Sequence, residues 1–259
     1  MCLIAFALEP SSRFRLVLAA NRDEFHDRPA APAHWWSSDQ SVYAGRDMLA
    51  GGTWLGVNRA GRAAALTNFR DRPYRGAGSR SRGELTAAYL ASGRASRDYA
   101  QSVAESVHEF GGFNLLLFEF DRPLAQCVYL SNRGESDAPQ ILSSGLHGLS
   151  NHLLNTPWPK VRRLQSALEA SLELTDPTEP LMAALADRSA IVPGEVDPVA
   201  HDPEPLIRAP FIADARYGTR ASTVLTVDHH GHVTFVERSW GWSQDAPYLF
   251  GERRVRFAL

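Results

Sequence analysis

The chain has 259 residues and a formal net charge of −2, with 44% apolar and 22% charged residues, a composition typical of a globular protein that can bury a core unaided. The balanced charge gives no basic footprint for nucleic acid, and no apolar run reaches the ~18 residues of a transmembrane helix. Its two cysteines, Cys2 and Cys127, make no disulfide framework. We expect a single domain over residues 1–259 in a reduced, cytoplasmic protein.

The chain begins with a candidate nucleophile. Cys2 opens the apolar run 2–8, and removal of Met1, which a small second residue permits, would leave Cys2 with a free α-amine. That amine has an ordinary pKa of about 7.7–8.0 and the thiol one of about 8.5, so the amine can take the thiol proton without a separate histidine. The alternative is structural, because cysteine is a small and commonly buried residue that fits the start of a strand without any chemistry.

Residues 2–25 predict a β-hairpin whose second strand ends in polar residues. Apolar runs over 2–8 and 14–21 flank a short turn, and the second run leads into Asn21-Arg22-Asp23-Glu24. Such a cluster either meets solvent at a strand end or brings charge next to the partner strand that begins with Cys2.

The stretch 25–52 predicts an irregular loop that walls a pocket. It contains prolines and glycines without clear periodicity, and long loops are often functional. We expect Trp35 and Trp36 either to line that pocket or to pack in the core beneath it. Residues 53–68 predict a second hairpin ending in Asn68, followed by Arg70, which would face an anionic substrate or solvent.

The rest of the chain alternates blocks of strands with pairs of helices. The patterns predict helices over 81–92, 96–108, 158–174 and 179–190, strands over 113–120, 127–131, 141–144, 146–150, 221–228 and 232–239, and a proline-rich loop over 191–210. This order favours an α+β, four-layer αββα sandwich, in which two antiparallel sheets face each other and helices cover their outer sides. Three histidines in the turn at 229–232 do not predict a metal site, because a tight turn cannot aim them all at one ion.

Several blocks of the sequence resemble the NRDE-motif family, also called the transport-and-Golgi-organisation family. They are Cys2, Asn21-Arg22-Asp23-Glu24, the blocks 51–57 and 67–70, Gly148-Leu149-Ser150-Asn151 with the block 156–160, and Tyr217-Gly218-Thr219-Arg220. That family is in turn similar to N-terminal nucleophile hydrolases, especially the bile-salt hydrolase and penicillin V acylase group. The resemblance therefore implies the αββα fold and an amidohydrolase that works through a thioester, with neither metal nor cofactor.

The resemblance also implies a second kind of function. Eukaryotic members are linked to haem, lipid and membrane-trafficking roles, so a non-catalytic carrier on the same fold is the alternative. A haem would need an axial ligand, for which the candidates are His26, His34, His147 and His152. The expected partner is a small amide, acyl or lipid-like molecule, or a haem, and not a nucleic acid.

The resemblance implies a role for each matching residue. Cys2 would be the nucleophile, and Asn68 resembles the asparagine that helps to form the oxyanion hole. Asn151 resembles the asparagine that positions the amine, and Arg220 resembles an arginine near the nucleophile that would lower the thiol pKa.

Arg22 and Asp23 resemble an arginine and an aspartate that follow the second strand. In the acylases two residues separate that pair, whereas here the two are adjacent, and adjacent side chains of a strand point to opposite faces. The two side chains therefore cannot both face Cys2 unless the strand bulges. We expect Asp23 to bind the α-amine, with Arg22 or Glu24 in support. An acyl tail of the substrate would lie on Trp35, Trp36 or Trp54.

Overall fold

The computed structural model describes residues 2–70, 78–121, 123–134, 136–189 and 209–259. Its elements in chain order are β1 (Cys2–Leu8), β2 (Phe14–Phe25), β3 (Ala30–Trp35), β4 (Val42–Asp47), β5 (Leu55–Asn58), β6 (Arg62–Asn68), α1 (Gly83–Ala91), α2 (Ser96–Ala104), the short 3₁₀ helix η1 (Val107–Glu109), β7 (Phe113–Glu119), β8 (Gln126–Ser131), β9 (Gln140–Leu142), β10 (Gly145–Leu149), α3 (Pro159–Ser171), α4 (Thr178–Leu185), β11 (Tyr217–Asp228), β12 (His232–Ser243) and β13 (Ala246–Ala258).

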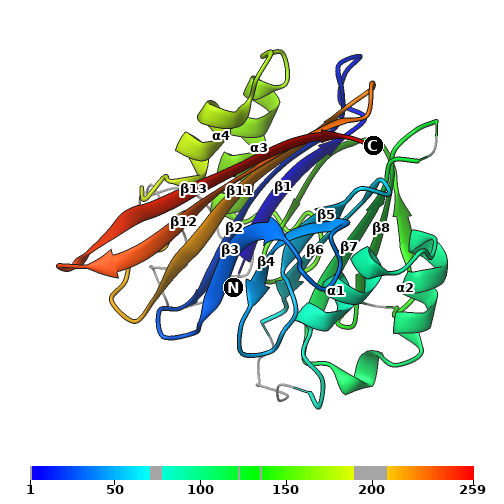
Figure 1. Ribbon diagram of the computed structural model, residues 1–259, viewed down its shortest axis with the longest axis horizontal. Coiled ribbons are helices and arrows are strands. Elements are labelled where there is room, and N and C mark those ends of the chain that lie inside the picture. Colours follow the sequence, from blue (N-terminus) through cyan, green and yellow to red (C-terminus); the bar gives the residue numbers. More distant parts are fainter. Residues whose placement is uncertain (1, 71–77, 122, 135, 190–208) are drawn as a thin grey trace.

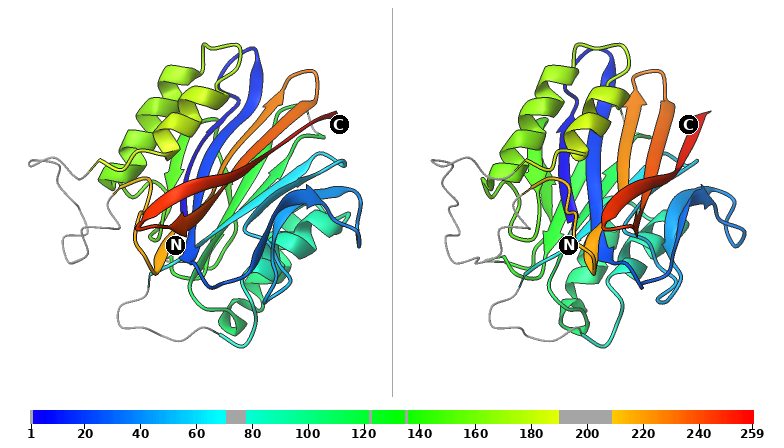
Figure 2. Two further views of the ribbon diagram at one scale, coloured as in Figure 1. Left: turned by 60° about the vertical axis from the view of Figure 1, so that its left-hand side comes forward. Right: turned by 90° about the vertical axis from the view of Figure 1, so that its left-hand side faces the viewer.

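Two antiparallel sheets stack face to face, and helices cover their outer sides (Figures 1 and 2). The first sheet has the strand order β10-β1-β2-β11-β12-β13, and the second has the order β3-β4-β5-β6-β7-β8-β9. Helices α3 and α4 lie on the first sheet, and α1 and α2 lie on the second (Figure 2). The predicted four-layer αββα sandwich is therefore confirmed.

Strand β1 contributes to two layers of the core because its side chains alternate between the faces of the sheet. Ile4 and Phe6 pack between the two sheets, where Phe6 meets Phe118 edge-on with ring centroids 5.3 Å apart. Leu3 belongs to the cluster under α3 and α4. The same alternation puts the side chain of Cys2 on the face between the sheets, at the end of the sandwich where β1 begins.

The stretch 25–52 is not an irregular loop, and that prediction was wrong. It contains β3 and β4, which pair with a shift of register between Ala31 and His34. Strand β3 lies at the edge of its sheet and carries Pro32, and proline is tolerated in sheets only at edges and bulges. The shifted register breaks the alternation of side chains that would otherwise have marked a strand.

Strand β13 was not predicted at all. It pairs with β12 along its whole length at the edge of the first sheet, and most of its side chains are exposed or half-buried. Val255 and Phe257 are half-buried against the core between the sheets, but no residue of the strand is fully buried, so its sequence lacks the apolar pattern of a core strand. Most of the predicted loop 191–210 lies outside the described residues. No described helix is long and apolar enough to cross a membrane.

A close contact between two backbones fixes the start of α1. The N–H of Thr53 donates to the carbonyl of Gly83 at 3.1 Å, and the hydroxyl of Thr86 donates to the carbonyl of Thr53 at 2.5 Å. A Cβ on Gly52 would lie 2.8 Å from the nitrogen of Glu84 and closer still to the carbonyl group of Gly83. Neither backbone can move aside without breaking these hydrogen bonds.

Gly52→Ala is therefore expected to lower the free energy of unfolding by about 1–3 kcal/mol, the usual cost of overpacking. Urea denaturation measures the change. Gly93→Ala is the matched control, because a Cβ on Gly93 meets no atom within 4 Å. Equal urea midpoints for the two variants would contradict the contact.

Candidate active site

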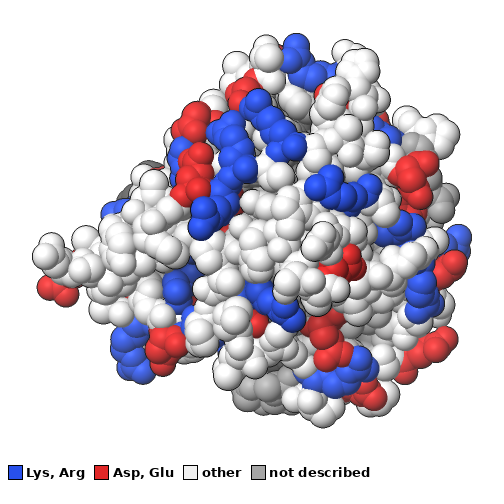
Figure 3. All heavy atoms as spheres, in the orientation of Figure 1, with Lys and Arg blue, Asp and Glu red and all other residues white. Residues whose placement is uncertain are grey.

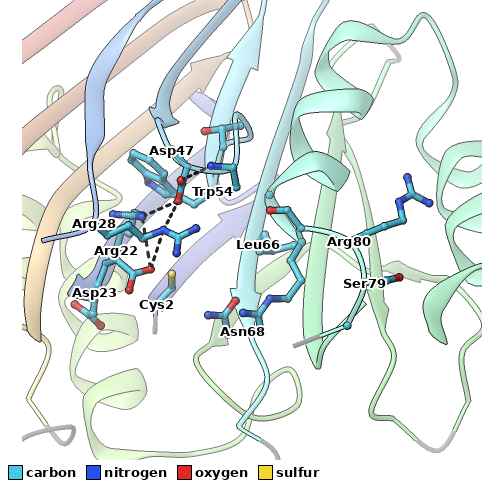
Figure 4. Close-up of a pocket in the computed structure, with 17 residues that line it drawn as sticks. Cys2, Arg22, Asp23, Arg28, Asp47, Trp54, Leu66, Asn68, Ser79 and Arg80 are labelled. Carbon is cyan, nitrogen blue, oxygen red and sulfur yellow. Dashed lines mark hydrogen bonds and ion pairs between the residues drawn. The ribbon is translucent and has the colours of Figure 1, made fainter. Parts of the chain in front are cut away.

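A pocket of about 380 Å³ opens where β1 begins (Figure 4). Its lining comes from the start of β1, the end of β2, the connection from β4 to β5, the end of β6 and the segment that leads into α1. The described residues that line it are Cys2, Arg22, Asp23, Glu24, Arg28, Asp47, Ala50, Thr53, Trp54, Leu66, Asn68 and residues 78–83.

Arg22 and Asp23 of β2 both lie next to Cys2, Arg22 with its side chain and Asp23 with its backbone N–H. Cys2 pairs with Arg22 in the register of β1 and β2, so these two side chains share the face between the sheets. The backbone N–H of Asp23 donates a hydrogen bond to the thiol of Cys2. The carboxylate of Asp23 instead accepts a hydrogen bond from the hydroxyl of Thr219 at 2.8 Å. The adjacent pair thus divides between the two faces of the strand, and the binding of the α-amine by Asp23 stays a prediction.

Arg220 lies on a bulge beside this pair and points elsewhere. The register of β11 against β2 shifts at Arg220, which makes it the extra residue of a β-bulge. Its guanidinium donates to the carbonyls of Phe25 and His26 at 2.9 and 3.0 Å. Arg220 is not among the described residues that line the pocket. It holds the chain that follows β2, and the structure does not bring it to Cys2.

Arg22 is buried, and its Nη1 finds no acceptor among the described residues. Its Nη2 lies 3.4 Å from Asp47 Oδ2, and its guanidinium carbon lies 4.5 Å from the centre of the Trp54 ring. Arg28 binds the same carboxylate of Asp47 at 2.6 Å. Within the described part of the chain, Arg22 Nη1 has no hydrogen-bond partner. A buried N–H without an acceptor is costly and rare, so this atom is suited to an acceptor on a bound molecule.

The environment of the Cys2 thiol acts on its pKa in both directions. Burial raises the pKa of the Cys2 thiol and the negative charge of Asp23 raises it further, whereas the positive charge of the N-terminal amine, the Arg22 guanidinium and the N–H of Asp23 lower it. The net shift is upward, so at neutral pH the thiol is mostly protonated. Nucleophilic attack from this position therefore needs a base close to the sulfur.

Asn68 lies at the end of β6 in the second sheet and lines the pocket. Asn151 lies outside the pocket lining and forms a hydrogen bond with the backbone of Asn68. Figure 4 shows the side chains of Asn68 and Cys2 facing the same space. The side-chain amide of Asn151 donates to the backbone carbonyl of Asn68 at 2.9 Å, and the backbone carbonyl of Asn151 accepts from the N–H of Arg70 at 2.9 Å. The hydroxyl of Ser150 donates to the carbonyl of Cys2 at 2.9 Å. Asn151 and Arg70 therefore stabilise the backbone around Asn68, but neither is among the described residues that line the pocket.

Comparison with known proteins shows the family. The family model described as Transport and Golgi organisation 2 matches residues 1–241. The chain belongs to this family. The resemblance found in the sequence blocks is thereby confirmed.

Relatives in the Transport and Golgi organisation 2 family match almost end to end. The Transport and Golgi organization protein 2 homolog of Bos taurus is 39% identical over 266 residues, which cover 92% of this chain and 93% of the relative. The human homolog is 38% identical with the same coverage, and the Drosophila melanogaster protein is 26% identical over 92% of each chain. A solved structure, the N-acylethanolamine-hydrolyzing acid amidase ortholog of Caenorhabditis elegans, matches with a TM-score of 0.43 and 10% identity over 87% of this chain and 92% of that chain. That likeness is too remote to indicate an activity.

Only one of the three tryptophans predicted to hold substrate lies in the pocket of this family member. Trp54 lines it beside Arg22. Trp35 packs edge-on against Tyr43 with ring centroids 5.1 Å apart, in the core between the sheets. Trp36 is buried under α1 and donates its indole N–H to the carbonyl of Ala44 at 3.1 Å. The packing alternative therefore describes Trp35 and Trp36.

The histidines considered as haem ligands are scattered. His26 forms a hydrogen bond with the carbonyl of Asp214, and His147 forms one with the carbonyl of Ser143. His152 forms a hydrogen bond with the hydroxyl of Thr156, and His34 is exposed. None of the four is among the described residues that line the pocket. The structure therefore does not gather these histidines around a common cavity.

The described surface carries both signs of charge. On the face shown in Figure 3, basic and acidic side chains are interspersed rather than segregated. A nucleic-acid-binding surface concentrates basic residues on one face. This face therefore gives no support to a nucleic-acid partner.

A buried glutamate lies on the same inter-sheet face as Arg22. Glu237 is 1% exposed, and its Oε1 accepts the N–H of Ala33 at 2.7 Å, while its Oε2 has no hydrogen-bond partner among the described residues. Burial raises the pKa of Glu237 from its ordinary value of 4.5 to about 7, against the opposing effects of the Ala33 N–H and of Arg22.

This pKa predicts a pH dependence of stability. A raised pKa in the folded state means that the proton stabilises the fold below pH 4.5 and that this contribution is lost as pH rises through 7. Between pH 5 and 8 the wild type should lose about 2–3 kcal/mol relative to Glu237→Gln. Urea unfolding of both proteins across that range measures the difference. Parallel curves would contradict a neutral, buried carboxyl.

Sequence reasoning missed Asp47 and Arg28. These two residues form ion pairs around Arg22. They lie in the stretch 25–52, which was predicted to wall a pocket and does contribute to this lining, but neither residue was singled out. Arg28 follows β2 closely in the chain, whereas Asp47 is the last residue of β4 and reaches Arg22 from the other sheet. No local signal in the sequence could have identified them.

Proposed function

We propose that this protein is an N-terminal-cysteine amidohydrolase that cleaves a small amide or acyl substrate through a thioester. The observation that carries the proposal is the pairing of Cys2 with Arg22 at the pocket. The thiol of the second residue shares one face of the sheet with a buried guanidinium whose Nη1 has no acceptor in the described part of the chain. A strand start that served only for packing would need neither a pocket nor a charged neighbour.

The reaction would use the α-amine of Cys2 as its base after removal of Met1. The amine takes the thiol proton, and the thiolate attacks the carbonyl carbon of the substrate. The tetrahedral adduct collapses when the α-ammonium returns that proton to the leaving nitrogen, which releases the amine and leaves an acyl thioester. Water then adds to the thioester with the α-amine as base, and the carboxylic acid leaves as the sulfur is protonated again.

Two groups around the pocket are placed to stabilise the oxyanion of the adduct. The side-chain amide of Asn68 faces the same space as the thiol (Figure 4), and Arg22 Nη1 has no other acceptor in the described chain. One such donor typically contributes about 10²–10³ in rate. An apolar part of the substrate would lie against Trp54.

The test compares one protein before and after its N-terminus is freed. A fusion with a protease site directly before Cys2 gives a blocked chain and, after cleavage, a free α-amine. Rates of Cys2 acylation by p-nitrophenyl acetate are followed by intact mass. Cleavage should raise the rate by about 10²–10⁴, the usual contribution of a general base.

Equal rates before and after cleavage would show that the α-amine is not the base. Retention of Met1 in the protein isolated from its native cells would contradict the proposal as well. A second fusion that leaves one glycine before Cys2 after cleavage is the matched control, because its amine is displaced by one residue. It should stay as slow as the uncleaved chain.

A further inference from the structure

Lys160 is the single lysine of the chain, and it is almost completely buried. Its exposed fraction is 2%, and it lies in the first turn of α3. Lysine is almost never fully buried unless its charge is compensated. Its Nζ lies 5.3 Å from the centre of the Trp158 ring, which favours a cation but does not replace a carboxylate.

Asp23 is the buried carboxylate on the side of the sheet that α3 covers. The neighbouring odd-numbered residues of β2, Val17 and Ala19, pack in the cluster under α3 and α4, so Asp23 follows them onto that face. Its exposed fraction is also 2%. Figure 4 shows its carboxylate pointing away from the Arg22 guanidinium.

Electrostatics couple the two residues. Burial raises the pKa of Asp23, and the net shift is upward; the positive charge of the N-terminal amine opposes it most, followed by the charge of Lys160, the hydrogen bond from Thr219 and the charge of Arg22. A carboxylate between an apolar helix layer and a strand would otherwise take up a proton. A protonated Asp23 could not serve as the anionic acceptor for an ammonium group.

We propose that Lys160 is a positioning residue that keeps a negative charge on Asp23, so that the carboxylate can hold the α-ammonium of Cys2. The step from Asp23 to the α-amine rests on the proposed hydrolase function. The pairing of Lys160 with Asp23 does not, and it can be tested separately. A lysine that only filled space against Trp158 would be indifferent to the charge of Asp23.

The single lysine makes the pairing directly measurable. Protein labelled with ¹³C and ¹⁵N in lysine alone gives one side-chain signal, whose pH titration reports the pKa of Lys160. Asp23→Asn should lower that pKa by about 1–3 pH units, because the buried ammonium loses its counter-charge. Asp47→Asn is the matched control, since Asp47 pairs with Arg22 and Arg28, and it should leave the titration unchanged.

An unchanged Lys160 titration in folded Asp23→Asn would overturn the pairing. If that variant does not fold, the wild type still decides, because the lysine signal should show a second inflection at acid pH as Asp23 takes up its proton. A wild-type signal without this inflection would overturn the proposal equally.

The positioning role has its own readout in the acylation rate. Lys160→Met should slow acylation of Cys2 by about tenfold or more, and Lys160→Arg should restore it because the charge is kept. If the Lys160 titration depends on Asp23 but Cys2 is never acylated, the proposed function is overturned and the pairing of Lys160 with Asp23 stands. Acylation at Cys2 without any coupling would overturn this inference alone.

Discussion

Cys2→Ala is expected to abolish acyl-enzyme formation and to lower hydrolysis of an amide or activated ester by about 10⁴–10⁶-fold, the loss seen when a nucleophile is removed. The reason is local, because the thiol of Cys2 lies in the pocket beside Arg22 and no other described residue that lines it carries a thiol. Product release and intact mass after mixing with p-nitrophenyl acetate measure the two effects.

Cys127→Ala is the matched control for this substitution. Cys127 is fully buried in β8 within the core between the sheets, and burial holds the pKa of its thiol well above the ordinary value. It should lose some stability but keep the full rate of acylation per folded molecule. Acylation that survives in Cys2→Ala, or that disappears in folded Cys127→Ala, would contradict the assignment of the nucleophile.

Arg22→Gln should lower the acylation rate at neutral pH by about 10²–10³-fold, through two separable effects. The guanidinium lowers the pKa of the Cys2 thiol, so its removal moves the pH profile of alkylation by iodoacetamide to higher pH. Its Nη1, which has no partner among the residues that the structure describes, is also lost as a donor to the oxyanion. The midpoint of the pH profile and the maximal acylation rate measure these effects independently.

Two further variants separate charge from geometry. Arg22→Lys keeps the positive charge but not the planar fork of donors, so it should restore the pH midpoint and leave the maximal rate low. Arg28→Gln removes a neighbour that also binds Asp47 and should leave the pH midpoint in place. A wild-type rate in Arg22→Gln would show that Nη1 has no part in the reaction.

The architecture was predictable because the core strands carry their pattern in the sequence. The runs that form β1, β2, β5, β6 and β7 are apolar and end at turns, and α3 shows a clear amphipathic stripe. The order of these elements was enough to predict the four layers. The two edge strands that the sequence did not reveal lack such a pattern: β3 is interrupted by Pro32, and β13 is largely exposed.

The candidate site was predictable where the chain itself places residues together. Cys2, Arg22 and Asp23 meet because one tight turn joins β1 to β2, and Asn68 ends a strand that the sequence showed clearly. The direction of a side chain was harder to predict. Arg220 is turned away by a β-bulge, and a bulge has no signature in a single sequence.

The partners of these residues come from distant segments. Asp47 reaches Arg22 from a strand in the other sheet, and Lys160 reaches the buried face near Asp23 from a helix 137 positions further along the chain. Such contacts depend on how the sheets and helices pack. No spacing rule in the sequence could have predicted them.

The central claim, that Cys2 forms an acyl thioester in this pocket, is tested most directly by trapping that intermediate. The cleaved protein with a free Cys2 is mixed with a panel of small N-acyl amides, quenched in acid within the first turnovers and digested. We expect an acyl mass on the N-terminal peptide that decays as free acid is produced. Hydrolysis without any adduct on that peptide, or an adduct that never turns over, would contradict it.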